Sequence, residues 1–366
     1  MRPRICATAW RCSSTGSTAR TSTASTSCRS SARQRRDAAE RPEEGAIERI
    51  GFGAFYSHRS GLSPGEFARR LEDLGFDGFW AGETPTNRDP SYDSFATLCF
   101  AAAATSRITV GSDVLLLPLH HPAWVAKQFG TLDVLSSGRA ILGVGVGGEF
   151  PKQFEGFGVP LSERGRRTDE GIEIVRSLWT EPESGYDSPR FRFEGITMEP
   201  KPLQHPHPPI WVGGRPGGVE TGPDGKPRFK STTGAIQRAA RYADAWDPYY
   251  MTPEMYRESV TAIRAHAEEI GRDVSSMEWA LTTFWLMRDS YDEALEAAAR
   301  KLRYGRDLSA RIARYDILGS PADVIRRLET FIDAGVRYFI CNWSCEPSEV
   351  PRHLELIGNE VIPHFR

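Results

Sequence analysis

The clearest pattern in the chain is a pair of apolar, β-branched runs separated by one amphipathic helix, between positions 108 and 149. The first run, 108–117, is apolar on both faces, which is typical of a parallel strand covered on both sides. Pro122 stands where a first helical turn tolerates proline, and apolar residues then recur at helical spacing. A second apolar strand follows at 140–144. The pattern predicts a βαβ unit.

The end of this unit, GVGVGG at 143–148, satisfies the dinucleotide-binding pattern G-x-G-x-x-G. That pattern belongs in the first βαβ unit of a domain, with a helix opening directly on the glycines. Here three strand-like segments precede the glycines, and Glu149, Phe150, Pro151 and a long irregular stretch follow in place of a helix start. We therefore interpret the segment as a glycine loop at the carboxyl end of a barrel strand, open to a phosphate or a flat ring.

The same alternation of buried strands and amphipathic helices continues along the chain from Ile50. Besides the two strands above, strands are predicted at 50–56, 76–82, 210–214, 243–250, 277–287 and 336–343. Helices are predicted at 63–74, 92–104, 122–135, 164–179, 253–270, 291–303, 321–334 and 347–358, with one more ending at Tyr242. Eight strands alternating with helices predict an α/β fold, a (β/α)8 TIM barrel with insertions. An open doubly wound sheet remains the alternative, since alternation does not reveal closure.

Two segments break the alternation and are interpreted as insertions. The sequence YDSPRFRFEGITMEPK, at 186–201, alternates aromatic and polar residues around a glycine and predicts a β-hairpin. The sequence RPGGVETGPDGKPRFK, at 215–230, is a loop by its glycine, proline and charge content.

Residues 1–45 differ in composition from the barrel domain expected at 46–366. They consist mainly of Ser, Thr, Arg and Ala and lack the apolar residues needed for a core. An organelle transit peptide, a solvated tail or a translation begun upstream of the true start would each have this composition. We favour a disordered tail or an upstream start, because the amphipathic pattern of a transit peptide is missing.

The overall composition narrows the partners that we expect. The formal net charge is -2 over 366 residues, which gives no sign of a nucleic-acid partner. No run approaches the roughly 18 apolar residues of a membrane span. Three of the six cysteines lie in the N-terminal segment without a framework around them, and no pair among Cys99, Cys341 and Cys345 has metal-ligand spacing. We therefore expect reduced thiols, no metal site and a cytoplasmic protein. A small-molecule substrate is the expected partner.

Three segments carry a family resemblance that runs from about Ile50 to the C-terminus. They are LDVLSSGRAILGVGVGGEFPKQFEGFGVPLSERGRRTDE at 132–170, MEPKP at 198–202 and PHPPIWVGG at 206–214. The chain resembles the bacterial-luciferase-like superfamily of flavin and deazaflavin oxidoreductases, and most resembles the branch that uses coenzyme F420. The resemblance implies a cofactor, F420 or alternatively FMN, lying across the carboxyl ends of the barrel strands. It also implies a homodimer or larger homo-oligomer.

The resemblance also implies which residues bind the cofactor. A bulge with a non-proline cis peptide behind the ring would fall on Asp113 and Val114. Phosphate binding would fall on glycine loops and on a helix start, where free N–H groups favour an anion: Gly147, Gly148, Gly213, Gly214, Thr233 and Gly234. The sequence departs from the family at one point, because about sixteen loop residues separate Gly214 from the capping threonines.

Two residues are the candidates for proton transfer. Family members of the deazaflavin branch often have a histidine or aspartate at the end of the second strand, where this chain has Gly82 and Glu83. Glu83 is suited to general acid–base catalysis if burial raises its pKa, and equally to capping or ion pairing. His120, after the third strand, is the second catalytic candidate. Weaker candidates at the rim are His58, His121, Glu149, Trp246, Tyr249 and Trp285, while Trp80 is assigned to the core.

These expectations lead to one main function and two alternatives. The main hypothesis is an oxidoreductase that transfers a hydride between reduced coenzyme F420 and a small organic substrate. An FMN-dependent monooxygenase on the same barrel is the first alternative. A non-catalytic flavin-binding barrel is the second, because Gly82 and the enlarged loop at 215–230 depart from the family.

Overall fold

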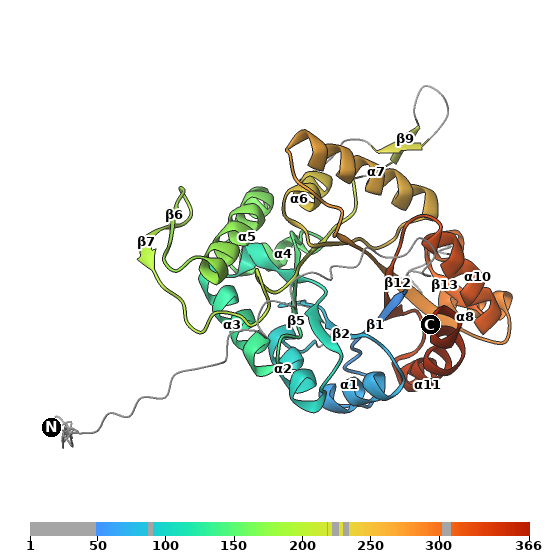
Figure 1. The fold of residues 1–366 in the computed structure, drawn as a ribbon. Helices are drawn as coiled ribbons and strands as arrows, with labels where there is room; N and C mark the ends of the chain where they lie inside the picture. Colours follow the sequence, from blue (N-terminus) through green and yellow to red (C-terminus); the bar gives the residue numbers. More distant parts are fainter. Residues whose placement is uncertain (1–48, 87–90, 218, 222–226, 230–233, 302–308) are drawn as a thin grey trace, which may run out of the picture. The chain divides into compact units, whose positions relative to one another are not determined.

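Eight parallel strands close into a barrel surrounded by helices (Figure 1). The computed structural model describes residues 49–86, 91–217, 219–221, 227–229, 234–301 and 309–366. The barrel strands, in the order in which each pairs with the next, are β1 (Gly51–Phe55), β2 (Gly78–Ala81), β3 (Thr109–Ser112), β5 (Ala140–Gly145), β8 (Ile210–Gly213), β11 (Ala245–Asp247), β12 (Glu278–Met287) and β14 (Tyr338–Trp343). The pairing of β1 with β14 closes the ring. The predicted TIM barrel is confirmed, and the open doubly wound alternative is wrong.

The helices lie outside the barrel, as the alternating pattern predicts (Figure 1). They include α1 (Pro64–Asp73), α2 (Ser94–Ala104), α3 (Pro122–Leu135), α5 (Arg164–Thr180), α6 (Gly234–Tyr242), α7 (Pro253–Glu269), α8 (Tyr291–Lys301), α10 (Pro321–Ile332) and α11 (Val350–Leu356). Local sequence sets several of their starts. Ser63 caps α1 in a capping box with Glu66, and Ser320 caps α10 in the same way with Asp323.

The insertion at 186–201 contains the predicted hairpin, formed by antiparallel strands β6 (Ser184–Asp187) and β7 (Arg192–Ile196). The segment at 215–230 was expected to be loop throughout, and this was wrong. It contains two antiparallel three-residue strands, β9 (Val219–Thr221) and β10 (Pro227–Phe229). Two short segments separated by five residues that include glycine are a sequence signal for a β-hairpin. The high glycine and proline content of the whole segment obscured this signal.

Three more elements lie where no element was expected. A six-residue helix, α4 (Pro151–Gly156), follows the glycine loop within the stretch interpreted as irregular. Helix α9 (Ser309–Tyr315) and strand β13 (Ile317–Gly319) lie between β12 and α10. All three are too short to show a periodic pattern. The predictions for residues 1–45 and for Thr233 lie outside the described residues.

The interior of the barrel is filled by aromatic side chains placed against glycines. The ring centroids of Trp80 and Trp211 are 4.5 Å apart, and Trp80 Nε1 donates a hydrogen bond to Tyr338 Oη at 3.2 Å. A Cβ atom at Gly78 would come within 2.9 Å of Trp80 Nε1, so glycine is needed where the indole crosses the barrel. Trp80 is therefore a core residue, as predicted.

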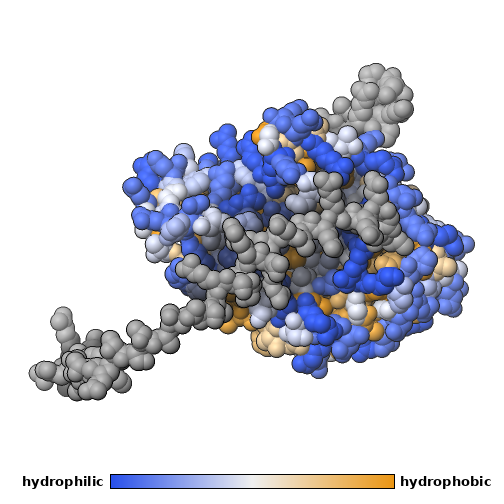
Figure 2. Space-filling model, viewed as in Figure 1, coloured by the Kyte–Doolittle hydropathy of each residue, from blue (hydrophilic) through white to orange (hydrophobic). Residues whose placement is uncertain are grey.

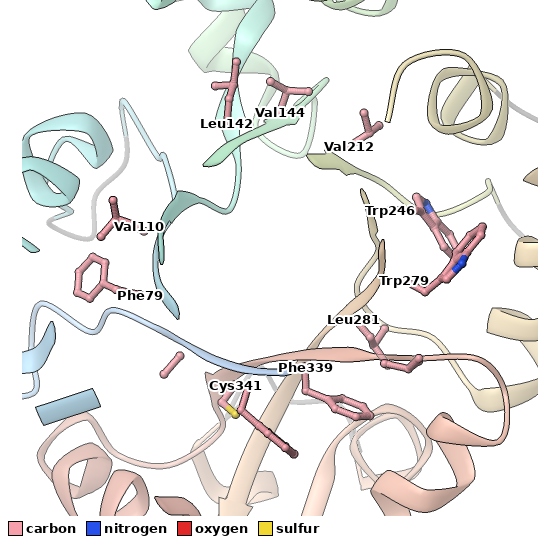
Figure 3. Close-up of a cluster of buried hydrophobic side chains, with 14 of the residues drawn as sticks. Phe79, Val110, Leu142, Val144, Val212, Trp246, Trp279, Leu281, Phe339 and Cys341 are labelled. Carbon is pink, nitrogen blue, oxygen red and sulfur yellow. The ribbon is translucent and has the colours of Figure 1, made fainter. Parts of the chain in front are cut away.

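A second layer of apolar side chains points outward from the strands and packs beneath the helices (Figure 3). Phe79, Val110, Leu142, Val212 and Phe339 each have no exposed surface. Because one face of each strand packs inside the barrel and the other beneath helices, the strands are apolar on both faces, as their sequences show.

The outer surface is mostly hydrophilic on the face shown in Figure 2, with hydrophobic residues gathered toward its lower edge, where α1 and α2 lie in Figure 1. Phe100 on α2 and Trp124 on α3 are 67% and 65% exposed. Among the described residues, no helix combines the length and apolar character needed to cross a bilayer.

Candidate active site

A cavity of about 320 Å³ lies at the carboxyl ends of the barrel strands. Residues at or just beyond the ends of β1, β2, β3, β5, β8 and β11, together with Thr282 and Phe284 of β12 and Asn342 of β14, form its wall. Seven of the sequence-predicted site residues are among them: Glu83, Asp113, Val114, Gly147, Gly148, Gly213 and Gly214. This is the end of a TIM barrel where the loops that follow the strands build active sites.

The third strand is interrupted at the cavity by a turn through Asp113 and Val114. The run predicted as one strand divides here into β3 and the short β4 (Leu115–Leu116). The peptide bond between Asp113 and Val114 is cis, the geometry that the family resemblance implied at this position. The turn places both residues in the cavity wall.

The side chain of Val114 covers two glycines on neighbouring strands. A Cβ atom at Gly145 would overlap Val114 Cγ2, and one at Gly213 would lie 2.8 Å from Val114 Cγ1. Gly82 is confined in a similar way, because a Cβ atom there would lie 2.7 Å from the Asp113 carbonyl oxygen. Steric packing therefore requires glycine at position 82.

The glycine loop after β5 has a left-handed backbone, with φ of 61° at Gly147 and 109° at Gly148. Gly214 also has a positive φ, 125°. These values favour glycine over any residue with a side chain. The Arg164 side chain lies beside Gly148, since a Cβ atom there would be 3.1 Å from Arg164 Nε. Gly234 begins α6 but does not line the cavity.

Glu83 and His120, the two catalytic candidates, form a hydrogen-bonded pair. Glu83 Oε1 lies 2.7 Å from His120 Nε2, and Glu83 Oε2 accepts a hydrogen bond of 2.6 Å from the Leu116 amide. The Glu83 side chain is 6% exposed. Burial by itself would lower the pKa of His120, but the hydrogen bond and charge of Glu83 outweigh it, so this pKa lies above its usual value. His120 does not itself line the cavity, so it contacts that space through Glu83.

A second polar cluster in the cavity wall joins Asp113, Thr282 and Asp247. Thr282 Oγ1 lies 3.0 Å from Asp113 Oδ2 and 3.1 Å from both carboxyl oxygens of Asp247. One hydroxyl has a single proton to donate, so two ionised carboxylates cannot both be satisfied by it. Burial raises the pKa of Asp113 to about 6, and burial together with the charge of Asp113 raises the pKa of Asp247 well above its usual range. The two carboxyls therefore hold a proton to a higher pH than isolated aspartates do.

The weaker candidates are divided between the cavity wall and the core. Tyr249 lines the cavity and its hydroxyl donates a hydrogen bond to Glu149, which also lines it. Trp246 and Trp285 are fully buried in the core. His121 precedes α3 as expected, but its side chain makes no capping hydrogen bond. His58 lies with its ring 5.7 Å from that of Tyr92 and does not line the cavity.

Sequence reasoning missed several residues of the cavity wall, among them Asp247, Thr282, Phe284 and Asn342. Asp247 had a usable signal, because it directly follows the buried Ala245 and Trp246 at the carboxyl end of a barrel strand. The other three lie within mainly apolar strands, β12 and β14. Which of their faces points into the barrel was not readable from the alternation.

Comparison with known proteins agrees with this architecture. Residues 63–220 match the model of the luciferase-like monooxygenase family. An FMNH2-dependent dimethylsulfone monooxygenase of Pseudomonas putida is 31% identical over 209 residues, which are 56% of this chain and 52% of that protein. The 5,10-methylenetetrahydromethanopterin reductase of Archaeoglobus fulgidus is 27% identical over 329 residues, 82% of this chain and 95% of the relative.

The chain spans between 52% and 64% of the lengths of the first curated relatives that it matches. Among solved structures, an F420-dependent secondary alcohol dehydrogenase in complex with an F420–acetone adduct has a TM-score of 0.70 at 22% identity, covering 87% of this chain and 99% of the other. At this identity the likeness concerns the fold. Together with the motif at 132–170, the family model matched over residues 63–220 and the closed barrel with its cavity, these similarities confirm that the chain resembles the luciferase-like superfamily of oxidoreductases and monooxygenases.

Proposed function

We propose that the chain is an oxidoreductase that holds reduced coenzyme F420 in the barrel cavity and transfers a hydride between it and a small organic substrate. The observation that carries this proposal is the cavity itself, with the Asp113–Val114 turn in its wall, glycine loops at its rim and the Glu83–His120 pair at one side. FMN is the alternative cofactor, and the chemistry would then be that of a monooxygenase. Relatives of both kinds support the shared part of the proposal.

The residues of the cavity fit a flat ring joined to a phosphate. The volume of about 320 Å³ lies within the usual range for cofactor sites, roughly 300–1,000 Å³. Val114 offers an apolar surface for the ring, while Gly147 and Gly148, beside Arg164, offer backbone N–H groups and a positive charge for a phosphate. When bound, F420 would supply the hydride in this reaction.

The chain's own residues would orient the substrate and manage the accompanying proton. Glu83 lies at the cavity with one carboxylate oxygen held by the Leu116 amide and the other paired with His120. A proton held between Glu83 and His120 is within reach of a group in the cavity, since Glu83 lines it. The Asp113–Thr282–Asp247 cluster is a second place where the wall holds a proton.

The proposal is tested by titrating the full chain with F420 and with FMN, oxidised and reduced, and following the quenching of tryptophan fluorescence. Tighter binding of F420 is the expected result. Tighter binding of FMN would replace the hydride-transfer chemistry with the monooxygenase alternative. Binding of neither cofactor would contradict the assignment of the cavity.

The role of Glu83 is tested by the Glu83→Gln variant. We expect cofactor affinity to stay within about threefold and turnover to fall by about 10²–10⁴-fold, the usual contribution of a positioned acid or base. Glu155→Gln is the matched control, because Glu155 is exposed and, among the residues that the structure describes, forms its ion pair with Lys152 alone. Unchanged turnover in Glu83→Gln would exclude Glu83 from proton transfer. Absence of turnover in the parent protein with every donor tested would favour a non-catalytic flavin-binding barrel.

A further inference from the structure

A hydrogen bond across the barrel closes the inner end of the cavity. Asp113 directly follows β3, Thr282 lies in β12, and three barrel strands separate β3 from β12 in either direction around the ring. Thr282 Oγ1 nevertheless lies 3.0 Å from Asp113 Oδ2, and both carboxyl oxygens of Asp247, at the end of β11, lie 3.1 Å from it. Because all three side chains line the cavity, they form its floor.

Thr282 joins the two carboxyls chemically as well as spatially. A hydroxyl group has one proton to donate and two lone pairs that accept. The Thr282 hydroxyl can therefore donate to the ionised carboxyl of Asp113 while it accepts from the protonated carboxyl of Asp247. The two carboxyls are also within hydrogen-bonding reach of each other. A proton can thus pass from Asp247 to Asp113, directly or through Thr282, without leaving the protein.

The two carboxyls differ in exposure and in how readily they ionise. Asp247 is 4% exposed, whereas Asp113 is only partly buried. Burial raises the pKa of Asp113 to about 6, while burial and the charge of Asp113 raise the pKa of Asp247 well above its usual range. When the pair holds a single proton, that proton is therefore stored on Asp247. Asp113 is then the ionised and more accessible member of the pair.

The other ionisable groups around the floor of the cavity are occupied by partners of their own. Tyr256 packs from α7, its hydroxyl donates a hydrogen bond of 2.9 Å to a backbone carbonyl of β12, and burial raises its pKa well above the ordinary tyrosine value. Glu83 and Glu149 line the same cavity, but Glu83 is paired with His120 and Glu149 accepts a hydrogen bond from Tyr249. The proton of the aspartate pair is therefore exchanged within the pair and with the cavity.

The proposed reaction requires two proton movements. When a hydride passes from the reduced cofactor to a substrate, the cofactor also loses a proton and the substrate also gains one. These movements occur at different atoms, and the cavity wall holds protons in two different places. Glu83, with His120, lies just beyond the end of β2, whereas Asp113 and Asp247 lie at the floor. Each place can serve one of the two movements.

We propose that Asp113 is the catalytic acid that protonates the substrate, and that Asp247 is the buried store of the proton that Asp113 delivers. As the hydride arrives with its electron pair, the proton moves from Asp247 to Asp113 and on to the substrate oxygen or nitrogen atom that gains negative charge. Both carboxyls are then ionised, and their repulsion favours uptake of a proton from water after the product leaves. Substrate oxidation uses the same groups in reverse. This inference rests on the proposed function and assigns the substrate's proton to the cavity floor.

The store is tested without any cofactor, by infrared spectra of the full chain and of Asp247→Asn over a range of pH. The spectrum of the parent minus that of the variant should contain the C=O band of one protonated carboxyl at pH values above about 6, where Asp113 is ionised. Asp316, whose pKa burial also raises to about 6, contributes equally to both spectra and cancels. The control difference, with Asp187→Asn at an exposed aspartate paired with Arg192, should lack the band. Absence of the band from the Asp247→Asn difference would show that Asp247 stores no proton.

The catalytic assignment is tested by the pH profile of turnover in substrate reduction. Asp113→Asn should lose about 10²–10⁴-fold at every pH, the usual contribution of a positioned acid. Asp247→Asn should stay within about threefold of the parent near pH 5, where Asp113 carries its own proton, and lose at least about tenfold near pH 8. A purely structural defect would lower turnover equally at both pH values, and Asp187→Asn should follow the parent. Parallel profiles of Asp247→Asn and the parent, or full turnover in Asp113→Asn, would overturn the proposal.

Failure of this inference can be distinguished from failure of the proposed function. If the parent binds cofactor and turns over substrate while Asp247→Asn keeps the profile of the parent, only the proton store is wrong. If the parent binds neither F420 nor FMN, the proposed function fails and the catalytic role of Asp113 fails with it. The infrared spectra still decide in that case whether Asp247 stores a proton. Thermal unfolding of each variant at both pH values checks that the fold is intact.

Discussion

The shared hydroxyl of Thr282 sets the charge state of the two aspartates that it contacts. With Asp113 and Asp247 both within 3.1 Å of one Oγ1 atom, ionisation of both carboxyls leaves one of them repelled and unsatisfied. The folded chain therefore keeps a proton that the unfolded chain releases above the ordinary aspartate pKa of 3.8. A proton held only in the folded chain stabilises that state most at low pH. The free energy of unfolding therefore falls as pH rises from about 4 through about 6, where Asp113 titrates, and it continues to fall toward the raised pKa of Asp247.

Replacing Asp247 by Asn should remove most of this pH dependence, because an amide keeps the shape and hydrogen bonds of a protonated carboxyl. We expect the unfolding free energy of Asp247→Asn, measured relative to that of the parent, to increase by roughly 1–3 kcal/mol as the pH rises from 4 to 7. Urea unfolding at both pH values measures the difference. Asp187→Asn, at an exposed aspartate paired with Arg192, is the control and should follow the parent. An identical pH dependence in Asp247→Asn would show that the pair shares no proton.

The turn between β3 and β4 and the strands beside it depend on each other through one side chain. Val114 fills the space that Cβ atoms at Gly145 and Gly213 would need. A larger residue at either glycine would push Val114 toward the cavity, so the strands and the turn determine the shape of the cavity wall together.

Gly145→Ala should cost about 1–3 kcal/mol of unfolding free energy by overpacking against Val114. The same substitution in a Val114→Ala background should cost at least about 1 kcal/mol less, because the overlapping methyl groups are gone. A double-mutant cycle of urea unfolding free energies measures this coupling. Additive costs would mean that Val114 and Gly145 do not constrain each other.

At the scale of the whole molecule, helices α2 and α3 carry large apolar side chains on the surface. Phe100, Trp124 and Leu135 are 67%, 65% and 77% exposed. Large exposed apolar side chains on two helices that contact each other are typical of an association surface. They are consistent with the homodimer that the family resemblance implied.

Phe100→Glu/Trp124→Glu should convert an oligomer to a monomer, because buried charges without partners oppose association. Light scattering coupled to size-exclusion chromatography, over a range of concentrations, gives the mass. Ile270→Glu, at a residue 40% exposed that follows α7, is the control and should keep the mass of the parent. A parent protein that is monomeric at all concentrations would contradict the expectation, as would a double variant that remains oligomeric.

Most of the barrel could be predicted because its elements carry their own signals. The eight strands show long apolar runs, and helices such as α1 and α10 begin with Ser-Pro capping sequences. Short elements were missed or misread, namely α4, α9, β9, β10 and β13, because three to seven residues do not display a period. Of the candidate site, the parts found in advance were those next to glycines or at strand ends.

The sequence alone determined the alternation of strands and helices, the glycine loops and the polar residues at the strand ends, because each of these depends on neighbours within about twenty positions. Tertiary structure decided the contacts that make the site. Glu83 and His120 are 37 positions apart, Asp113 and Thr282 are 169 apart, and the pairing of β1 with β14 joins the two ends of the barrel. Such contacts form only when closure brings the carboxyl ends of all eight strands around one space. No local sequence pattern indicates which of those strands will face each other across the enclosed space.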